Sequence, residues 1–322
     1  MKHWMIAGAV AGAVAFSPIS ALAQALGMGA GAQGSQNYAV KGVLTNFLAE
    51  KLGLDLRLQS FGGSGASMPL INNGRLDMQA IVSPDVIAGV LAQEPFAGMT
   101  PMGDIQVIAA LGPSYYGFMV QRDSAMQSVA DVKGQRMTYG FTGQPTLRLQ
   151  VDGILANGGL EPGDVQPVLV PSVPRGVDDL IAGQADVAFF ALRGGKTREA
   201  DAAIGIRWLA LVDTPEAEAA MQEWVPGSYV ATVAPEAGIL GIDTPTPMMA
   251  YDYWLVAGAH VDDELAYNIA KLIAEQADAV AKLHGTLGGF TKDLMVPANT
   301  FGVSLHPGAE RYYREVGMMP AR

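Results

Sequence analysis

The sequence predicts an α/β protein divided into two lobes. Three observations support this: short apolar runs alternate with helix-length segments, glycine and proline are frequent, and two aromatic-rich runs interrupt the alternation. Strand–helix alternation is typical of layered α/β folds with mostly parallel sheets. The 39 glycines and 19 prolines supply the many turns that such a fold needs.

The expected strands are short apolar runs, in chain order Asp55–Leu58, Met78–Val82, Gln106–Leu111, Gly117–Gln121, Arg136–Tyr139, Val187–Phe190, Trp208–Val212 and Tyr251–Ala257. The expected helices lie between them, at Tyr38–Leu52, Thr146–Asn157, Gly176–Ala182 and Asp262–Leu283. The last helix has the clearest signal, because apolar residues recur at helical spacing from Leu265 to Leu283 and Gly285 can end it.

Two aromatic-rich runs, Ser114–Gln121 and Met248–Gly258, are interpreted as hinge strands that join otherwise regular units. If the chain leaves one lobe at the first run and returns at the second, the inserted segment forms a lobe of its own. We therefore expect residues 24–112 with 247–322 in lobe I and residues 113–246 in lobe II.

The N-terminus predicts an export signal, residues 1–23. Lys2 is followed by an apolar run from Met5 to Phe16, and Ala21-Leu22-Ala23 places small residues where a signal peptidase cleaves. A membrane anchor is the alternative, but the run is shorter than the ~20 apolar residues of a spanning helix. We expect cleavage after Ala23 and a location in the periplasm, or secretion.

Composition excludes several classes of function. The 31 acidic and 20 basic residues give a net charge of −11, and no basic stripe for nucleic acid is found. The absence of cysteine excludes disulfides, thiolate metal sites and cysteine nucleophiles. With only four scattered histidines, a histidine metal site is not expected either, and no cofactor or metal is predicted.

Four loops, most of them glycine-rich, are candidates for binding a ligand: residues 27–38, 60–67, 139–146 and 191–196. Each loop follows a strand, and three of them lead into a predicted helix. The carboxyl ends of strands are where open α/β sheets bind ligands, and the unpaired N–H groups of a helix start suit an anion. The first loop also matches the dinucleotide pattern through Gly29, Gly31 and Gly34, and a plain turn is a further alternative. Four such loops in succession favour a ligand cleft between the lobes.

Three motifs carry a resemblance to a known family: Gly62-Gly63-Ser64 followed by Leu70 and Gly74-Arg75-Leu76-Asp77, then Ser128–Arg136, and finally His306-Pro307-Gly308-Ala309 with Tyr312-Tyr313. The chain resembles the TAXI-type solute receptors of TRAP (tripartite ATP-independent periplasmic) transporters. The resemblance implies a two-lobe periplasmic-binding-protein fold (type II) with the ligand cleft between the lobes. It also implies a small organic solute, often an acidic amino acid or dicarboxylate, and delivery to membrane permease subunits driven by an ion gradient.

The chain departs from the family pattern in the loops that face the solute. Gln33, Gln36 and Asn37 replace hydroxyl or aromatic residues, and Pro145 removes a backbone donor. Phe61 replaces a threonine, and Arg193 stands where a glycine is usual. The candidate ligand-binding residues are Gln33, Ser35, Gln36, Asn37, Tyr38, Phe61, Gly63, Ser64, Ser67, Thr142, Gln144, Thr146 and Arg193.

The ligand is expected to be a small organic anion of the acidic amino acid, dicarboxylate or keto acid class. None of the four loops holds a carboxylate, and Arg193 can clamp a ligand carboxylate with two parallel hydrogen bonds. Alternatively, Arg193 is a surface residue paired with Glu199, and Arg175 is a weaker candidate for the clamp. His306 is expected to fix the C-terminal turn.

Other functions remain as alternatives to a TRAP receptor. One is the binding protein of an ABC importer for sulfonate-like anions, and another is a sensor module. A periplasmic enzyme such as a dehydratase needs a buried acid or base at the cleft. The loops contain none, and Asp77 and Asp186 are expected to cap turns. We therefore predict a monomeric binding protein that is not an enzyme, with the solute and a membrane permease as its partners.

Overall fold

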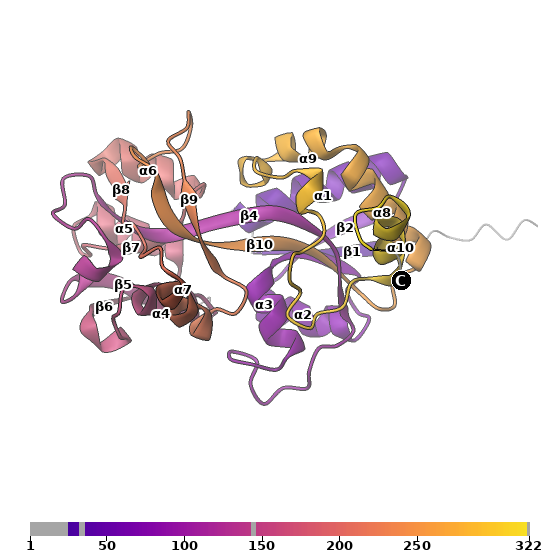
Figure 1. The fold of residues 1–322 in the computed structure, drawn as a ribbon, viewed down its shortest axis with the longest axis horizontal. Helices are drawn as coiled ribbons and strands as arrows, with labels where there is room; N and C mark the ends of the chain where they lie inside the picture. Colours follow the sequence, from indigo (N-terminus) through magenta and orange to yellow (C-terminus); the bar gives the residue numbers. More distant parts are fainter. Residues whose placement is uncertain (1–24, 32–35, 143–145, 321–322) are drawn as a thin grey trace, which may run out of the picture.

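The computed structural model describes residues 25–31, 36–142 and 146–320. It has two lobes joined by two long antiparallel strands, β4 (Ile105–Gln121) and β10 (Thr246–Gly258), which run side by side between them (Figure 1). The predicted export signal, residues 1–23, lies outside the described residues. Within the described part of the chain, no helix has both the length and the apolar character needed to cross a membrane.

Lobe I contains both ends of the described part of the chain, from β1 to α10. Its elements are β1 (Leu26–Ala30), α1 (Gln36–Leu52), β2 (Leu56–Ser60), α2 (Ser64–Asn72), β3 (Met78–Val82), α3 (Ser83–Val90), α8 (Asp263–Glu275), α9 (Ala277–Leu283), α10 (Pro307–Glu315) and the short 3-10 helices Gly285–Leu287 and Lys292–Leu294. The strand order is β2-β1-β3-β10-β4. The first three strands pair in parallel, and β10 joins β3 in antiparallel fashion.

Lobe II is built from the middle of the chain. Its elements are 3-10 helices Val129–Val132 and Pro162–Asp164, β5 (Arg136–Gly140), α4 (Thr146–Asn157), β6 (Gln166–Val170), α5 (Val173–Ile181), β7 (Ala188–Ala191), α6 (Gly195–Ile204), β8 (Ile206–Trp208), α7 (Pro215–Trp224) and β9 (Tyr229–Val233). Strands β7 and β8 pair with β4, and β9 pairs with β10, all antiparallel. Strands β5 and β6 form a separate parallel pair.

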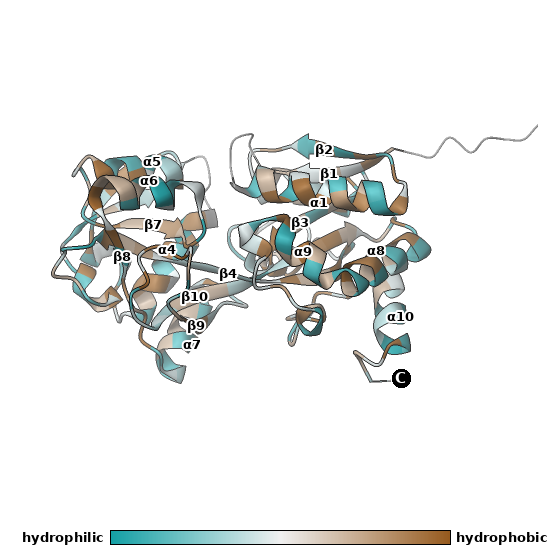
Figure 2. Cartoon of the chain, turned by 90° about the horizontal axis from the view of Figure 1, so that it is seen from above, coloured by the Kyte–Doolittle hydropathy of each residue, from teal (hydrophilic) through white to brown (hydrophobic). Residues whose placement is uncertain are grey.

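The expectation of mostly parallel sheets is wrong for the central sheet. Apart from isolated one-residue bridges, parallel pairing in the described structure joins β1 to β2 and β3, and β5 to β6. The two crossing strands run in opposite directions and pair antiparallel with each of their neighbouring strands. Both strands enter the cores of both lobes: Ile108 and Trp254 are buried in lobe I, and Phe118 and Met248 in lobe II. In the view from above in Figure 2, these two strands run from one lobe to the other.

The predicted hinge runs are parts of longer strands. Gly112-Pro113 separates two predicted strands in the sequence, yet β4 continues through it, because Pro113 still lies opposite Asp252 of β10. Gly112 has a φ of 92°, and a Cβ there would lie 3.3 Å from the backbone of Phe290, so the close approach requires glycine. The lobe boundaries proposed from the sequence both fall within these two strands.

Two predicted elements have different limits in the structure. The helix expected over Asp262–Leu283 is divided at Gln276, whose φ of −113° and ψ of 27° are not helical, although the apolar spacing continues through it. The strand expected at Trp208–Val212 is instead Ile206–Trp208. The residues after it make only isolated backbone contacts, among them a one-residue parallel bridge between Ala210 and Ser128.

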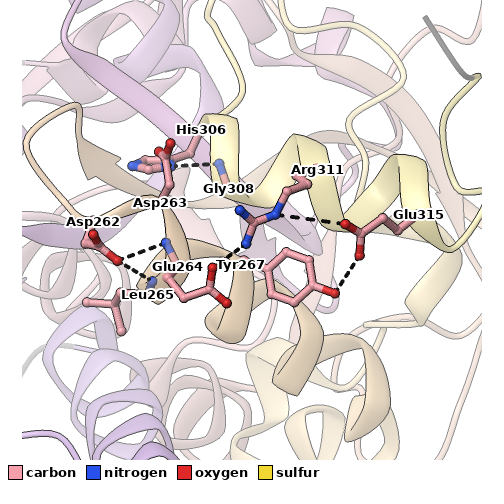
Figure 3. A network of polar contacts seen from close by, with 9 residues as sticks. All are labelled: Asp262, Asp263, Glu264, Leu265, Tyr267, His306, Gly308, Arg311 and Glu315. Carbon is pink, nitrogen blue, oxygen red and sulfur yellow. Dashed lines mark hydrogen bonds and ion pairs between the residues drawn. The ribbon is translucent and has the colours of Figure 1, made fainter.

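The C-terminal His-Pro-Gly motif locks α10 against α8 (Figure 3). His306 is fully buried; its Nδ1 accepts the N–H of Gly308, and its Nε2 donates to the carbonyl oxygen of Val261 at 3.1 Å. Burial lowers the pKa of His306, which keeps the ring neutral. Arg311 of α10 adds a 2.6 Å ion pair with Glu264 of α8. His306 therefore fixes the C-terminal turn, as the sequence predicts.

Candidate functional site

Three helices of lobe I begin next to the hinge strands, and their first turns converge with hinge tyrosines. Asn37 of α1 accepts a 3.1 Å hydrogen bond from the Tyr253 hydroxyl, and the Ser64 hydroxyl of α2 donates to Asp85 of α3. We call the whole group the junction cluster; its members are Asn37, Lys41, Ser64, Asp85, Tyr116, Tyr251 and Tyr253. The cluster connects the first turns of lobe I helices to tyrosines of the two hinge strands.

Lys41 is the most unusual member of the junction cluster. Its side chain is buried, with the residue 4% exposed, and its ammonium lies 6.0 Å from the centre of the Tyr253 ring. Within the described residues, the ammonium has no hydrogen bond and no carboxylate oxygen within 4.0 Å. Burial lowers the pKa of Lys41 to about 7, although the nearby Asp85 acts in the opposite direction. A buried cation that has no partner among the described residues favours a bound anion.

Asp85, the third residue of α3, places a carboxylate in the same cluster. Burial raises the pKa of Asp85 to about 6, while the Ser64 hydrogen bond and the charge of Lys41 oppose the rise. The sequence analysis found no carboxylate in the four candidate loops and did not identify Asp85 as a site residue. Asp85 was missed because α3 follows β3 directly, with no glycine-rich loop between them. The Ser83-Pro84-Asp85 helix start after a buried strand is the signal that could have revealed it.

The hinge tyrosines connect the junction cluster to lobe II. The Tyr251 hydroxyl donates to the Gln150 side chain of α4 at 2.8 Å, and the Tyr116 and Tyr251 rings stack at 4.7 Å. Burial raises the pKa of Tyr116, Tyr251 and Tyr253, so all three hydroxyls are neutral near pH 7. Tyr251 and Tyr253 are buried and their hydroxyls already donate to Gln150 and Asn37, so these tyrosines connect the elements of the cluster without adding charge.

Arg193 lines a pocket where lobe II meets the hinge. The pocket has a cavity volume of about 20 Å³, room for about one water molecule. It is lined by Pro113, Ser114, Tyr115, Tyr116, Ala191, Leu192, Arg193 and Thr286. Because Tyr116 belongs to both, the pocket adjoins the junction cluster. The guanidinium lies 3.7 Å from Glu236, whereas Glu199, the surface partner considered from the sequence, pairs with Lys196 at 2.8 Å. Arg175 pairs with Asp179 at 2.8 Å.

The other predicted site residues have different surroundings. Asn37 and Ser64 belong to the junction cluster, and Ser67 is buried with its hydroxyl on the Gly63 carbonyl at 3.3 Å, where it fixes the first turn of α2. Tyr38 and Phe61 are half-buried, Gly63 borders open space, and Thr142 is exposed. Gln33, Ser35 and Gln144 lie outside the described residues, as do the side chains of Gln36 and Thr146.

The two carboxylates expected to cap turns instead hold strands that are distant in sequence, so that expectation is wrong. Asp77 accepts the backbone N–H of Gly27 at 2.6 Å and also pairs with His260, and Asp186 accepts the N–H of Arg136 at 3.1 Å. In the described residues, no three His, Asp or Glu side chains are grouped closely enough to hold a metal ion.

The model of the NMT1-like family matches residues 28–317, nearly the whole described chain. The chain belongs to the NMT1-like family. This NMT1-like protein shares the two-lobe fold of periplasmic binding proteins. The predicted two-lobe α/β fold class is therefore confirmed.

Three solved structures illustrate the likeness. MatC from Rhodopseudomonas palustris with bound malate has a TM-score of 0.55 at 14% identity, over 91% of this chain and 96% of MatC. PhnD1 from Prochlorococcus marinus in complex with methylphosphonate has a TM-score of 0.54 at 13% identity, over 91% and 98%. The binding protein component of an ABC phosphonate transporter from Pseudomonas aeruginosa has a TM-score of 0.50 at 14% identity, over 83% and 80%. At these low sequence identities, the similarity shows only that the three proteins and this chain share a fold.

Proposed function

We propose that the protein is a periplasmic receptor that captures a small organic anion between its lobes and delivers it to a membrane permease. The proposed solutes are acidic amino acids, dicarboxylates and keto acids. The observation that carries this proposal is Lys41, a buried ammonium with no hydrogen-bond or ion-pair partner in the described residues. A buried cation without an ion-pair partner is unfavourable, and a solute anion at Lys41 would stabilise it.

Arg193 belongs to lobe II and Lys41 to lobe I, and Tyr116 of the hinge strand β4 lines the Arg193 pocket. A solute that contacts both cations bridges the lobes, so it binds the closed arrangement better than an open one. A ligand shifts such an equilibrium only by its differential affinity for the two states. The ligands of two proteins of this fold, malate for MatC and methylphosphonate for PhnD1, are also small anions.

The permease is proposed to be of the TRAP type, with the protein as its TAXI-like receptor. The Gly62-Gly63-Ser64 turn and the His306–Tyr313 segment support this assignment through their resemblance to TAXI receptors. An ABC importer for sulfonate-like anions is the second candidate, favoured by the ABC phosphonate transporter component that shares this fold. A neighbouring permease gene without an ATPase supports the first candidate, and a neighbouring ATPase gene supports the second.

A thermal-shift screen of the purified protein tests the proposed function. The panel comprises amino acids, dicarboxylates, keto acids, sulfonates, neutral sugars and polyamines. A ligand that binds only the folded state adds ~2.7 kcal/mol of stability at a hundred times its dissociation constant. We expect a clear rise in Tm with at least one organic acid and none with sugars or polyamines. A rise with only neutral or cationic compounds contradicts the proposal.

Arg193→Ala is expected to weaken binding of the acid found in that screen. Because the Arg193 side chain is 33% exposed and near Glu236, the loss should lie at the lower end of the ~2–5 kcal/mol typical of a charged partner removed from an anion. Calorimetry measures the affinity, with Arg175→Ala as the matched control on a neighbouring helix. An affinity within twofold of the parent excludes Arg193 as a ligand contact.

A further inference from the structure

We propose that a contact behind the hinge, between the turn joining α7 to β9 in lobe II and two apolar side chains of lobe I, holds the lobes apart until a solute binds. We call it the back contact; its members are Gly227, Ile87 and Phe301. The proposal rests on the proposed function, because it takes closing of the lobes as the step that traps the solute.

The turn around Gly227 touches lobe I directly. A Cβ at Gly227 would lie 2.6 Å from Cδ1 of Ile87 in α3 and 3.5 Å from Cε2 of the Phe301 ring, in the segment before α10. Gly227 also has a φ of 82°, which favours glycine. Glycine therefore meets two needs at this position, a left-handed backbone and a close approach to the other lobe.

The turn is fastened to the rest of lobe II. Ser228 is buried, and its hydroxyl donates to the carbonyl oxygen of Val225 at 2.7 Å. The carbonyl oxygen of Ser228 accepts the side-chain amide of Gln222, a residue of α7, at 2.8 Å. The turn is therefore tied to α7 and moves with lobe II when the lobes move.

Phe301 is held on lobe I in an unusual backbone conformation. Its φ of 51° is unfavourable for a bulky residue, and its N–H donates to the Asn299 side chain at 2.8 Å. Phe301 is 38% exposed, whereas Val303, two residues later, is buried in the same core as Ile87. Such strain persists where the surrounding structure fixes it, and it concentrates at functional positions. The ring is therefore presented to lobe II by a fixed segment of lobe I.

The back contact lies on the other side of the hinge from the proposed solute site. In Figure 2, α7 and β9 lie below the hinge strands, whereas α1, which carries Lys41, and α6, which follows Arg193, lie above them. Side-chain alternation along β10 agrees with this view. Tyr253 points to the junction cluster, whereas Asp252, on the opposite face, accepts the hydroxyl of Tyr229 at the start of β9 at 3.1 Å.

Bending about the hinge strands moves their two sides in opposite directions. When the lobes close over the solute site, the Gly227 turn separates from Ile87 and Phe301, and apolar surface of both side chains becomes exposed to water. The back contact therefore stabilises the arrangement described here against the closed one. Because a rarely populated binding-competent state lowers the apparent affinity, weakening the contact is expected to raise the affinity. Damage to the fold would have the opposite effect.

A distance measurement between the lobes tests the proposal without any solute. The chain has no cysteine, so Asn46→Cys in α1 and Arg198→Cys in α6, both at exposed positions, introduce two spin labels and no others. Double electron–electron resonance on the unliganded protein should give shorter distances in Phe301→Ala and in Gly227→Ala than in the labelled parent. The first change removes the ring from the contact, and the second drives a Cβ against Ile87.

Gly238→Ala and Leu294→Ala are the matched controls, and both should keep the parent's distances. Gly238 has a φ of 90° and a Cβ there meets no atom within 4 Å, so this change strains the backbone without reaching lobe I. Leu294 is 42% exposed, close to Phe301, but lies outside the back contact. Thermal unfolding shows which variants are folded, and Phe301→Ala alone decides the result if Gly227→Ala does not fold. Unchanged or longer distances in Phe301→Ala overturn the proposal.

Calorimetry with malate, glutamate and 2-oxoglutarate extends the test to affinity. Any of these acids that binds the parent should bind Phe301→Ala about three- to tenfold more tightly, since closing then breaks less contact. Unchanged or weaker binding by folded Phe301→Ala overturns the proposal. Failure of the parent to bind any acid of the screening panel counts against the proposed function alone, because the distances between the lobes are measured without solute.

Discussion

Replacement of Lys41 by methionine is expected to weaken binding of the organic acid by about 2–5 kcal/mol, or roughly 30-fold to several thousandfold. Methionine keeps the length and apolar stem of the side chain but removes the ammonium. The ligand carboxylate would then be buried opposite Asp85 without a positive partner. This is the largest effect on binding that we expect from any single side chain in the junction cluster.

Calorimetry and thermal unfolding together check the expected result for Lys41. Lys51→Met is the matched control, since Lys51 is on the same helix, with a side chain 45% exposed and paired only with Glu50. Because the buried ammonium is unfavourable in the free protein, Lys41→Met should lose binding without lowering the Tm. An affinity within twofold of the parent would show that Lys41 does not anchor the anion.

The same lysine makes the affinity depend on pH. Its pKa in the free protein is lowered from 10.5 to about 7, so the ammonium is present at pH 6 and largely lost at pH 8.5. Anion affinity should therefore fall up to tenfold per pH unit above about pH 7, and the fall should disappear in Lys41→Met. The unfolded chain binds more protons between about pH 7 and 10.5, so the contribution of Lys41 to stability rises with pH in that window.

The sequence predicts the layers of this fold better than the paths of its crossing strands. Alternating apolar runs identify β2, β3, β5 and β7 because each is a local strand closed by a nearby turn. Strand β4 reads as two strands because Gly112-Pro113 is a usual break, and only pairing with distant β10 carries the strand through it. The direction of β10 likewise depends on long-range pairing, which periodicity does not encode.

The candidate site also contains residues that local sequence signals predict and residues that only long-range packing brings into place. Arg193 was predicted because it follows a strand in a glycine-containing loop, and it does line a pocket at the hinge. Lys41 was missed because a single lysine within a helix is usually solvent-exposed, and nothing local distinguishes it from Lys51. Its burial results from α1 packing beside Tyr253, a residue more than two hundred positions away. Such convergence is visible only once the fold brings the segments together.

The largest effect on stability is expected from Gly308→Ala in the C-terminal motif. A Cβ at Gly308 would lie 1.9 Å from the carbonyl oxygen of Asp263 and 3.0 Å from the backbone nitrogen of Tyr267. Both contacts are with backbone atoms of α8, so relief requires α10 to move away from α8 and not a rotamer change. The motion would also stretch the Arg311–Glu264 ion pair and the hydrogen bond of buried His306 to Val261.

Overpacking a core with extra methyl groups costs ~1–3 kcal/mol, and a clash with rigid backbone should reach or exceed the upper end. Chemical denaturation measures the free energy of unfolding, with Gly163→Ala as the control, since a Cβ there meets no atom within 4 Å. The control should stay within ~0.5 kcal/mol of the parent. Because α10 packs on α8 and not on the junction cluster, the folded fraction of Gly308→Ala should keep the parent's ligand affinity. A loss below 1 kcal/mol would show that α10 can shift freely on α8, and that the His-Pro-Gly segment does not lock the two helices together.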